Sequence, residues 1–117
     1  MKNKNVLNSF YYAFQGINIV WKERNFKLHI LSAILAISMA YILKISNIEW
    51  CIVLLCIGIV LMAEVFNTTI EKIVDMVSPE HNPKAGIIKD LAAAAVLIIS
   101  IVAAVIAVII FTPYFLK

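Results

Sequence analysis

The sequence contains few residues that break helices and little that would build anything other than helices. It has three glycines and three prolines in 117 residues, and no stretch alternates apolar and polar residues as a half-buried strand does. Cys51 and Cys56 lie five residues apart on one apolar run, a spacing from which a helix cannot bridge them comfortably. His29 and His81 lack a spaced cysteine or histidine partner. These absences exclude a β fold, a disulfide scaffold and a zinc site.

Apolar residues dominate the composition of the chain. They make up 63% of the chain and charged residues only 15%, whereas soluble domains are about 45–50% apolar. A core of this size could not hide so much apolar surface, so lipid must cover part of it. We predict an all-α integral membrane protein with one domain over residues 1–117, and we expect no nucleic-acid partner.

Three apolar segments predict membrane-spanning helices: 28–43, 48–66 and 91–111. A span needs about 20 residues, so the first is short. The second is expected to continue as a helix to about residue 77. Between the second and third, residues 78–90 predict a loop, because they hold the turn residues Pro79, Pro83 and Gly86.

The first 27 residues predict an amphipathic helix that lies on the membrane surface. Their apolar residues recur at helical spacing, as Val6, Leu7, Phe10, Phe14, Ile17 and Trp21. No continuous apolar core or small-residue cleavage site precedes residue 28, so a cleaved signal peptide is not expected. The alternative is a helix that only packs on the bundle and touches no substrate, and the two readings are compatible.

Basic residues predict the orientation. Eight of the ten lie on one predicted side: Lys2, Lys4, Lys22, Arg24, Lys27, Lys72, Lys84 and Lys89. Only Lys44 and Lys117 lie on the other. By the positive-inside rule, the N-terminus and the 78–90 segment face the cytoplasm.

A ladder of polar residues marks the cytoplasmic end of the second span. Glu64, Asn67, Glu71 and Asp75 stand at i, i+3, i+7 and i+11, so on a helix they stay within roughly a 60° sector. Acids at membrane depth are costly and normally face a bundle interior, where they serve ions, protons or chemistry. The alternative is a solvated helix end with a charged face. The apolar run before Glu64 favours a functional site.

Lys89 and Asp90 stand just before the third span. A lysine there can extend toward the interface and meet a phosphate, and Asp90 can orient it. The alternative is an ordinary basic flank. The chain has neither a G-x-x-x-x-G-K-[ST] loop nor a protein-kinase glycine-rich loop, so any nucleotide chemistry uses another scaffold.

Two motifs resemble the bacterial membrane diacylglycerol kinase and undecaprenol kinase family. One is the segment from Glu64 to Asp75, and the other is Lys89-Asp90-Leu91-Ala92-Ala93-Ala94-Ala95-Val96-Leu97. The segments Phe14-Gln15-Gly16 and Glu23-Arg24-Asn25-Phe26-Lys27 also resemble the family. The likeness runs from about Asn8 to Phe111.

The resemblance implies a homotrimer of three-span chains in the bacterial cytoplasmic membrane, which phosphorylates a lipid hydroxyl with ATP and Mg²⁺. It implies that Glu64 is the general base and that Asn67 belongs to the same reaction centre. Glu23 and Glu71 resemble the two acidic ligands of the divalent metal bound to ATP. A Mg²⁺ ion often uses only one or two carboxylates together with substrate phosphates.

The resemblance also implies a nucleotide site made by Tyr12, Glu23, Glu71, Glu80, His81, Asn82, Lys89 and Asp90. His29 stands where the diacylglycerol kinases of Gram-negative bacteria have an acid, which is more similar to the undecaprenol kinase branch. The lipid acceptor, undecaprenol or diacylglycerol, stays open. The alternative function is a small proton- or cation-coupled transporter that uses Glu64 as its ion site.

Overall fold

The computed structural model describes residues 5–117 and consists of four helices: α1 (Val6–Val20), α2 (Arg24–Leu43), α3 (Asn47–Val77) and α4 (Pro83–Phe115). No strand occurs within 5–117, so the all-α prediction is confirmed. Lys2 and Lys4, which contribute to the charge asymmetry, lie outside the described residues.

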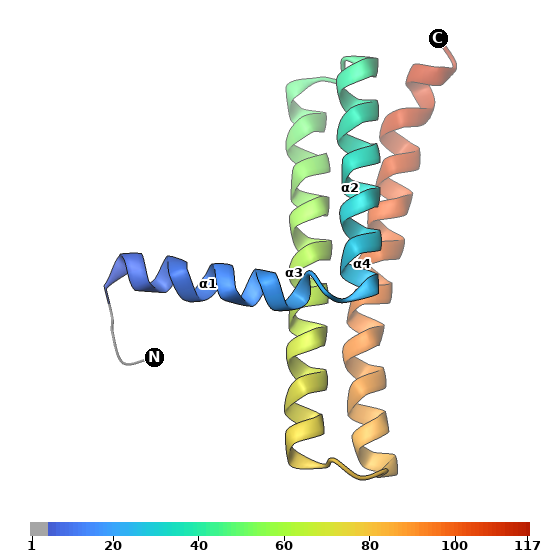
Figure 1. The fold of residues 1–117 in the computed structure, drawn as a ribbon. Helices are drawn as coiled ribbons and strands as arrows, with labels where there is room; N and C mark the ends of the chain where they lie inside the picture. The colour runs from blue at the N-terminus through green and yellow to red at the C-terminus, as the bar shows by residue number, and fades with distance from the viewer. Residues whose placement is uncertain (1–4) are drawn as a thin grey trace.

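Helices α2, α3 and α4 stand side by side as a bundle (Figure 1). Each is long and apolar enough to cross a membrane, so the chain is a multi-pass membrane protein. At 1.5 Å per residue, α2 is about 30 Å long, the thickness of a bilayer's hydrocarbon core, whereas α3 is about 46 Å long. One end of α3 and α4 therefore extends past the start of α2, as Figure 1 shows.

Helix α4 begins eight residues before the expected start of the third span. Asn82 caps it, because its side chain accepts a hydrogen bond from the Lys84 backbone N–H at 2.9 Å. Pro83 occupies the first turn, where its fixed φ suits a helix and its missing N–H has no partner to lose. The loop predicted over 78–90 is therefore confined to 78–82, and the turn predicted at Gly86 is wrong because Gly86 is helical.

The opposite end of the bundle is closed by a short turn between α2 and α3. Ser46 and Glu49 form a capping box at the start of α3, in which each side chain accepts from the other's backbone N–H. Beside this turn lies a cluster of buried apolar residues: Ala40, Ile45, Val53, Ile110 and Phe111.

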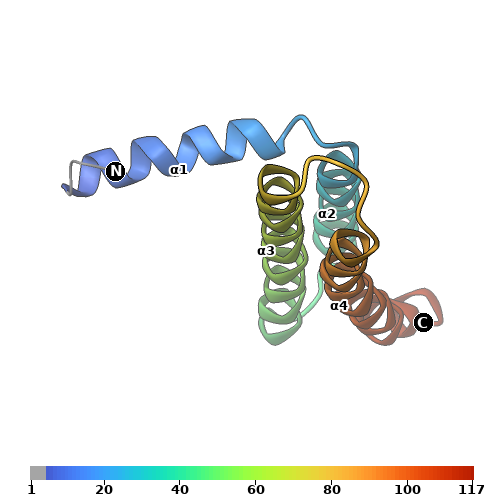
Figure 2. The ribbon, with the colours of Figure 1, turned by 90° about the horizontal axis from the view of Figure 1, so that it is seen from below.

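Helix α1 projects sideways from the bundle and meets it only near its C-terminal end (Figures 1 and 2). Its large apolar side chains, including Phe10, Phe14 and Ile17, are exposed. An apolar face that nothing in the described chain covers agrees with a helix lying on a membrane. That location stays a prediction.

Candidate active site

The four ladder residues follow a gradient of burial along α3. Glu64 and Asn67 are only 3% and 6% exposed. Glu71 is half-buried, and Asp75 is exposed. The helical spacing therefore does place them on a face that begins inside the bundle and ends outside it.

Glu64 has two polar neighbours. The Asn67 Nδ2 group donates to Glu64 Oε2 at 3.4 Å, and His29 Nε2 of α2 lies 3.4 Å from Glu64 Oε1. Asn67 Oδ1 and the buried Thr68 Oγ1 have no hydrogen-bond partner in the described chain. Buried polar atoms normally have partners, so unsatisfied atoms around a buried acid mark a place for a ligand or water.

Sequence reasoning missed Thr68 and the contact between His29 and Glu64. Thr68 is four residues after Glu64, so helical spacing alone would have put it beside that acid. The His29 contact joins two helices, and no spacing within one helix reveals it.

Glu23 lies at the junction of α1 and α2, close enough to Glu71 of the ladder for their charges to interact. The negative charges of Glu23 and Glu64 both repel that of Glu71. Glu23 occupies the N-cap position of α2, yet its side chain makes no capping hydrogen bond. Its carboxylate is therefore not committed to the helix end.

Glu23 and Glu71 are two acids that could together hold a divalent cation. Their repulsion would be relieved by a cation, and both offer the hard oxygen ligands that Mg²⁺ prefers. No group of three or more His, Cys, Asp or Glu side chains that could hold a metal occurs within residues 5–117. Two carboxylates suffice when substrate phosphates complete the coordination.

Lys89 of α4 reaches across to α3, where its Nζ lies 2.6 Å from Asp75 Oδ1. The sequence suggested that Asp90 orients this lysine, but Asp75 is its ion-pair partner in the structure. The ladder's outermost acid therefore ties α3 to α4. The Lys89 side chain is 38% exposed and that of Asp75 is 64% exposed, so the pair contributes little to stability.

The other residues predicted to contact the nucleotide lie in the 78–82 loop and on α1, outside the ladder on α3. Glu80, His81 and Asn82 are exposed in the 78–82 loop, and Asn82 is engaged in capping α4. Tyr12 is exposed near the middle of α1, against Tyr11 at a ring separation of 5.4 Å. Tyr12 belongs to α1, which projects away from α3 (Figure 2).

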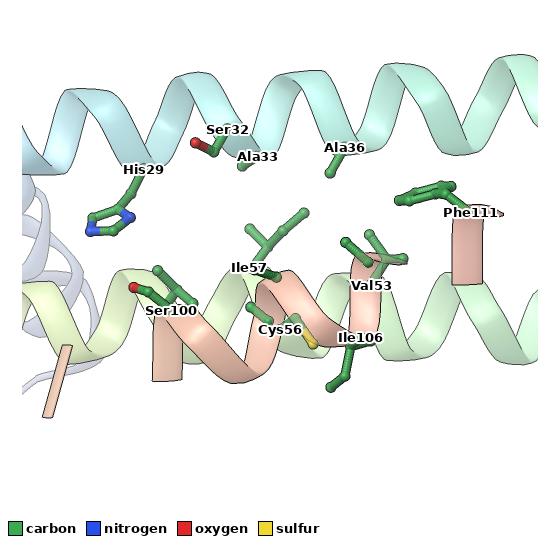
Figure 3. Close-up of a pocket in the computed structure, with 14 residues that line it drawn as sticks. His29, Ser32, Ala33, Ala36, Val53, Cys56, Ile57, Ser100, Ile106 and Phe111 are labelled. Carbon is green, nitrogen blue, oxygen red and sulfur yellow. The ribbon is translucent and has the colours of Figure 1, made fainter. Parts of the chain in front are cut away.

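An apolar cavity of about 330 Å³ opens between α2, α3 and α4. Figure 3 shows His29 and Ser100 toward one end and Phe111 toward the other. Small residues from two helices line it: Ala33, Ala36, Ala103, Ala104 and Ala107. His29 both lines the cavity and contacts Glu64, so the cavity begins beside the buried acid.

Comparison with known proteins adds the following. The profile of the family described as "Prokaryotic diacylglycerol kinase" matches residues 11–111. Undecaprenol kinase of Bacillus subtilis is 34% identical over 116 residues, which cover 95% of this chain and 94% of that protein. Diacylglycerol kinase of Synechocystis is 34% identical over 87% of this chain and 59% of its own length. Diacylglycerol kinase of Escherichia coli is 30% identical over 80% and 78%.

Proposed function

Because the chain belongs to the prokaryotic diacylglycerol kinase family and is therefore a lipid kinase, we propose that it moves the terminal phosphoryl group of ATP to the hydroxyl of a membrane lipid, with Glu64 as general base. The observation that carries this assignment is Glu64 itself. It is a buried acid beside Asn67, whose Oδ1 has no partner in the described chain, and it contacts His29, which lines the apolar cavity.

In the proposed reaction, the lipid oxygen attacks the γ-phosphorus of ATP as its proton passes to a carboxylate oxygen of Glu64. The bond between the γ-phosphorus and the bridging oxygen breaks, and ADP leaves with that electron pair. Phosphoryl transfer depends mostly on positioning and charge neutralisation. Asn67, with one amide end on Glu64 and the other free, is suited to orient the attacking hydroxyl.

Glu23 and Glu71 would hold the Mg²⁺ ion. When bound, that ion neutralises phosphate charge during transfer. Lys89, held by Asp75, adds a positive charge near the same face and would attract the nucleotide phosphates. Asp90 and the exposed Glu80, His81 and Asn82 stay proposed nucleotide contacts, as does Tyr12 of α1.

The cavity supports a lipid acceptor. An apolar chain lying between α2 and α4 would bring a hydroxyl at its end to His29 and Glu64. The acceptor is undecaprenol or diacylglycerol, the two lipids named in the relatives' descriptions. The enzyme would lie in the bacterial cytoplasmic membrane, with the N-terminus and the 78–82 loop in the cytoplasm, where ATP is available. We also propose that the chain assembles as a homotrimer, which native mass spectrometry of the protein released from detergent would test.

The direct experiment incubates purified protein with γ-labelled ATP, Mg²⁺ and either undecaprenol or diacylglycerol in mixed micelles. The expected result is label in the lipid phosphate, dependent on Mg²⁺. Label in neither lipid, from protein whose helical content is intact, would overturn the proposal. In that case, ion-driven uptake into vesicles would test the transporter alternative.

A further inference from the structure

We propose that His29 is the group through which the proton collected by Glu64 leaves the active site; this inference rests on the proposed function. A base that is 3% exposed has almost no direct contact with water. After each transfer it must nevertheless lose its proton before it can act again. Among residues 5–117, His29 is the group in direct contact with Glu64 that can take that proton.

The two polar neighbours of Glu64 differ in this respect. Asn67 presents its amide nitrogen, which donates hydrogen bonds and cannot take up a proton. His29 presents an imidazole nitrogen, Nε2, at 3.4 Å from Glu64 Oε1. Neutral imidazole has one nitrogen that accepts. The separation is somewhat longer than a tight hydrogen bond, as is common before substrate binds.

His29 also reaches further out than Glu64 does. Its side chain is 21% exposed against 3% for Glu64, so it connects the buried carboxylate with the surroundings. Glu64 is the acid that faces it from α3. The other cavity residues offer no competing carboxylate or imidazole: α2 contributes Ser32 and alanines, α3 contributes Cys56 and aliphatic residues, and α4 contributes Ser100, alanines, Ile106 and Phe111.

The proton route balances over one turnover. The lipid O–H bond breaks, and its proton forms an O–H bond on Glu64. That bond then breaks as Glu64 passes the proton to Nε2 of neutral His29, which becomes imidazolium. His29 releases one proton to water and returns to the neutral form. The phosphoryl group has moved from ATP to the lipid, and one proton has moved from the lipid hydroxyl to water.

The cavity makes a chemical test feasible. Replacing His29 by alanine enlarges a space that is already about 330 Å³, into which free imidazole can diffuse and stand in for the missing ring. We would measure kcat and KM for MgATP in wild type, His29→Ala, His29→Gln and Ser38→Ala, with and without added imidazole. Ser38 is an exposed polar residue elsewhere on α2, so its variant is the control. His29→Gln keeps a polar side chain of similar reach, in case the alanine variant folds poorly.

We expect both His29 variants to lose about tenfold or more in kcat, within the range of proton-transfer groups, with KM for MgATP nearly unchanged. Imidazole should restore part of the kcat of His29→Ala but not of His29→Gln or Glu64→Gln. Wild-type kcat in folded His29 variants, or a loss in folded His29→Ala that imidazole does not restore, would overturn the proposal. The wild type reports separately on the proposed function, because failure there would appear as no lipid phosphate at all.

Discussion

Two glutamates of the same helix, fifteen residues apart, have opposite surroundings. Glu49 accepts hydrogen bonds from the Ser46 backbone N–H at 3.0 Å and from the Tyr114 hydroxyl. It thereby links the start of α3 to the end of α4. Glu64 is nearly fully buried, makes a long contact with His29, and lies among polar atoms without partners.

This is the difference expected between an acid with a structural role and the proposed general base. The oxygen of Glu49 is occupied by donors from its own chain, so that carboxylate holds two helix ends in place. The bonds around Glu64 are long and incomplete, which leaves its lone pairs open to a substrate hydroxyl. The two glutamates share a residue type and a helix, and they differ in how completely their hydrogen bonds are satisfied.

The largest predicted effect on the transfer rate comes from replacing each of these two glutamates by glutamine, in separate variants. Glu64→Gln should lower the rate of phosphoryl transfer by about 10²–10⁴-fold, the usual contribution of a general base. Glu49→Gln should leave the rate close to wild type. Label transfer to lipid measures both rates, and circular dichroism checks the fold. Similar rates in both variants would remove the distinction.

The metal-binding assignment of Glu23 and Glu71 gives the next effect. Glu71→Gln and Glu23→Gln should each raise the Mg²⁺ concentration needed for half-maximal activity by about tenfold, which corresponds to about 1.4 kcal/mol of binding. Each removes one of two proposed carboxylate ligands. Glu49→Gln is again the control. Titrations identical to wild type in both variants would contradict the two-carboxylate site.

Filling the cavity should have a smaller and more selective effect. Ala104→Leu places a larger side chain in the lining, so kcat/KM for a long-chain lipid should fall about four- to fifteenfold. This is the factor for one or two displaced methylenes at about 0.8 kcal/mol each. KM for MgATP should not move. Ala94→Leu is the matched control, since Ala94 is exposed and outside the lining. An equal loss in both variants would argue against a chain in this cavity.

The smallest predicted effect is on stability, and it distinguishes two serines. Ser46→Ala removes a helix cap and should lower the free energy of unfolding by about 1 kcal/mol. Ser100→Ala removes a hydroxyl that has no partner in the described chain, so stability should be unchanged or slightly higher. Unfolding in mixed micelles with increasing denaturing detergent measures both. A larger loss for Ser100→Ala would indicate that its hydroxyl has a partner in the membrane.

The sequence predicted those features that lie within one helix. Apolar runs located the spans, and the 3.6-residue period placed Glu64 and Asn67 on an interior face. It misplaced the start of α4, because hydropathy detects apolar residues, whereas Asn82 and Pro83 begin the helix within a polar stretch. It missed the contact of His29 with Glu64, since the relative height of two helices comes from packing.

The sequence also did not predict the ion pair of Asp75 with Lys89, because that pair depends on how the 78–82 loop aligns α3 with α4. An adjacent acid, Asp90, looked like the natural partner in the sequence. Consecutive residues on a helix point about 100° apart, so an acid on the neighbouring helix can be the nearer one. Contacts between helices require the folded bundle.

Because α3 is one continuous helix, it fixes how far apart its residues lie along the membrane normal. At 1.5 Å per residue, Glu71 stands about 10 Å further along the axis than Glu64, and the helix is continuous between them. The proposed metal ligand Glu71 and the proposed base Glu64 are therefore held at a fixed distance along the bundle axis. The hydroxyl of the proposed lipid substrate would instead follow the height of the bilayer surface. Bilayers of different thickness shift that surface relative to the bundle. The acyl-chain length of the host membrane should thus tune turnover without altering a single side chain.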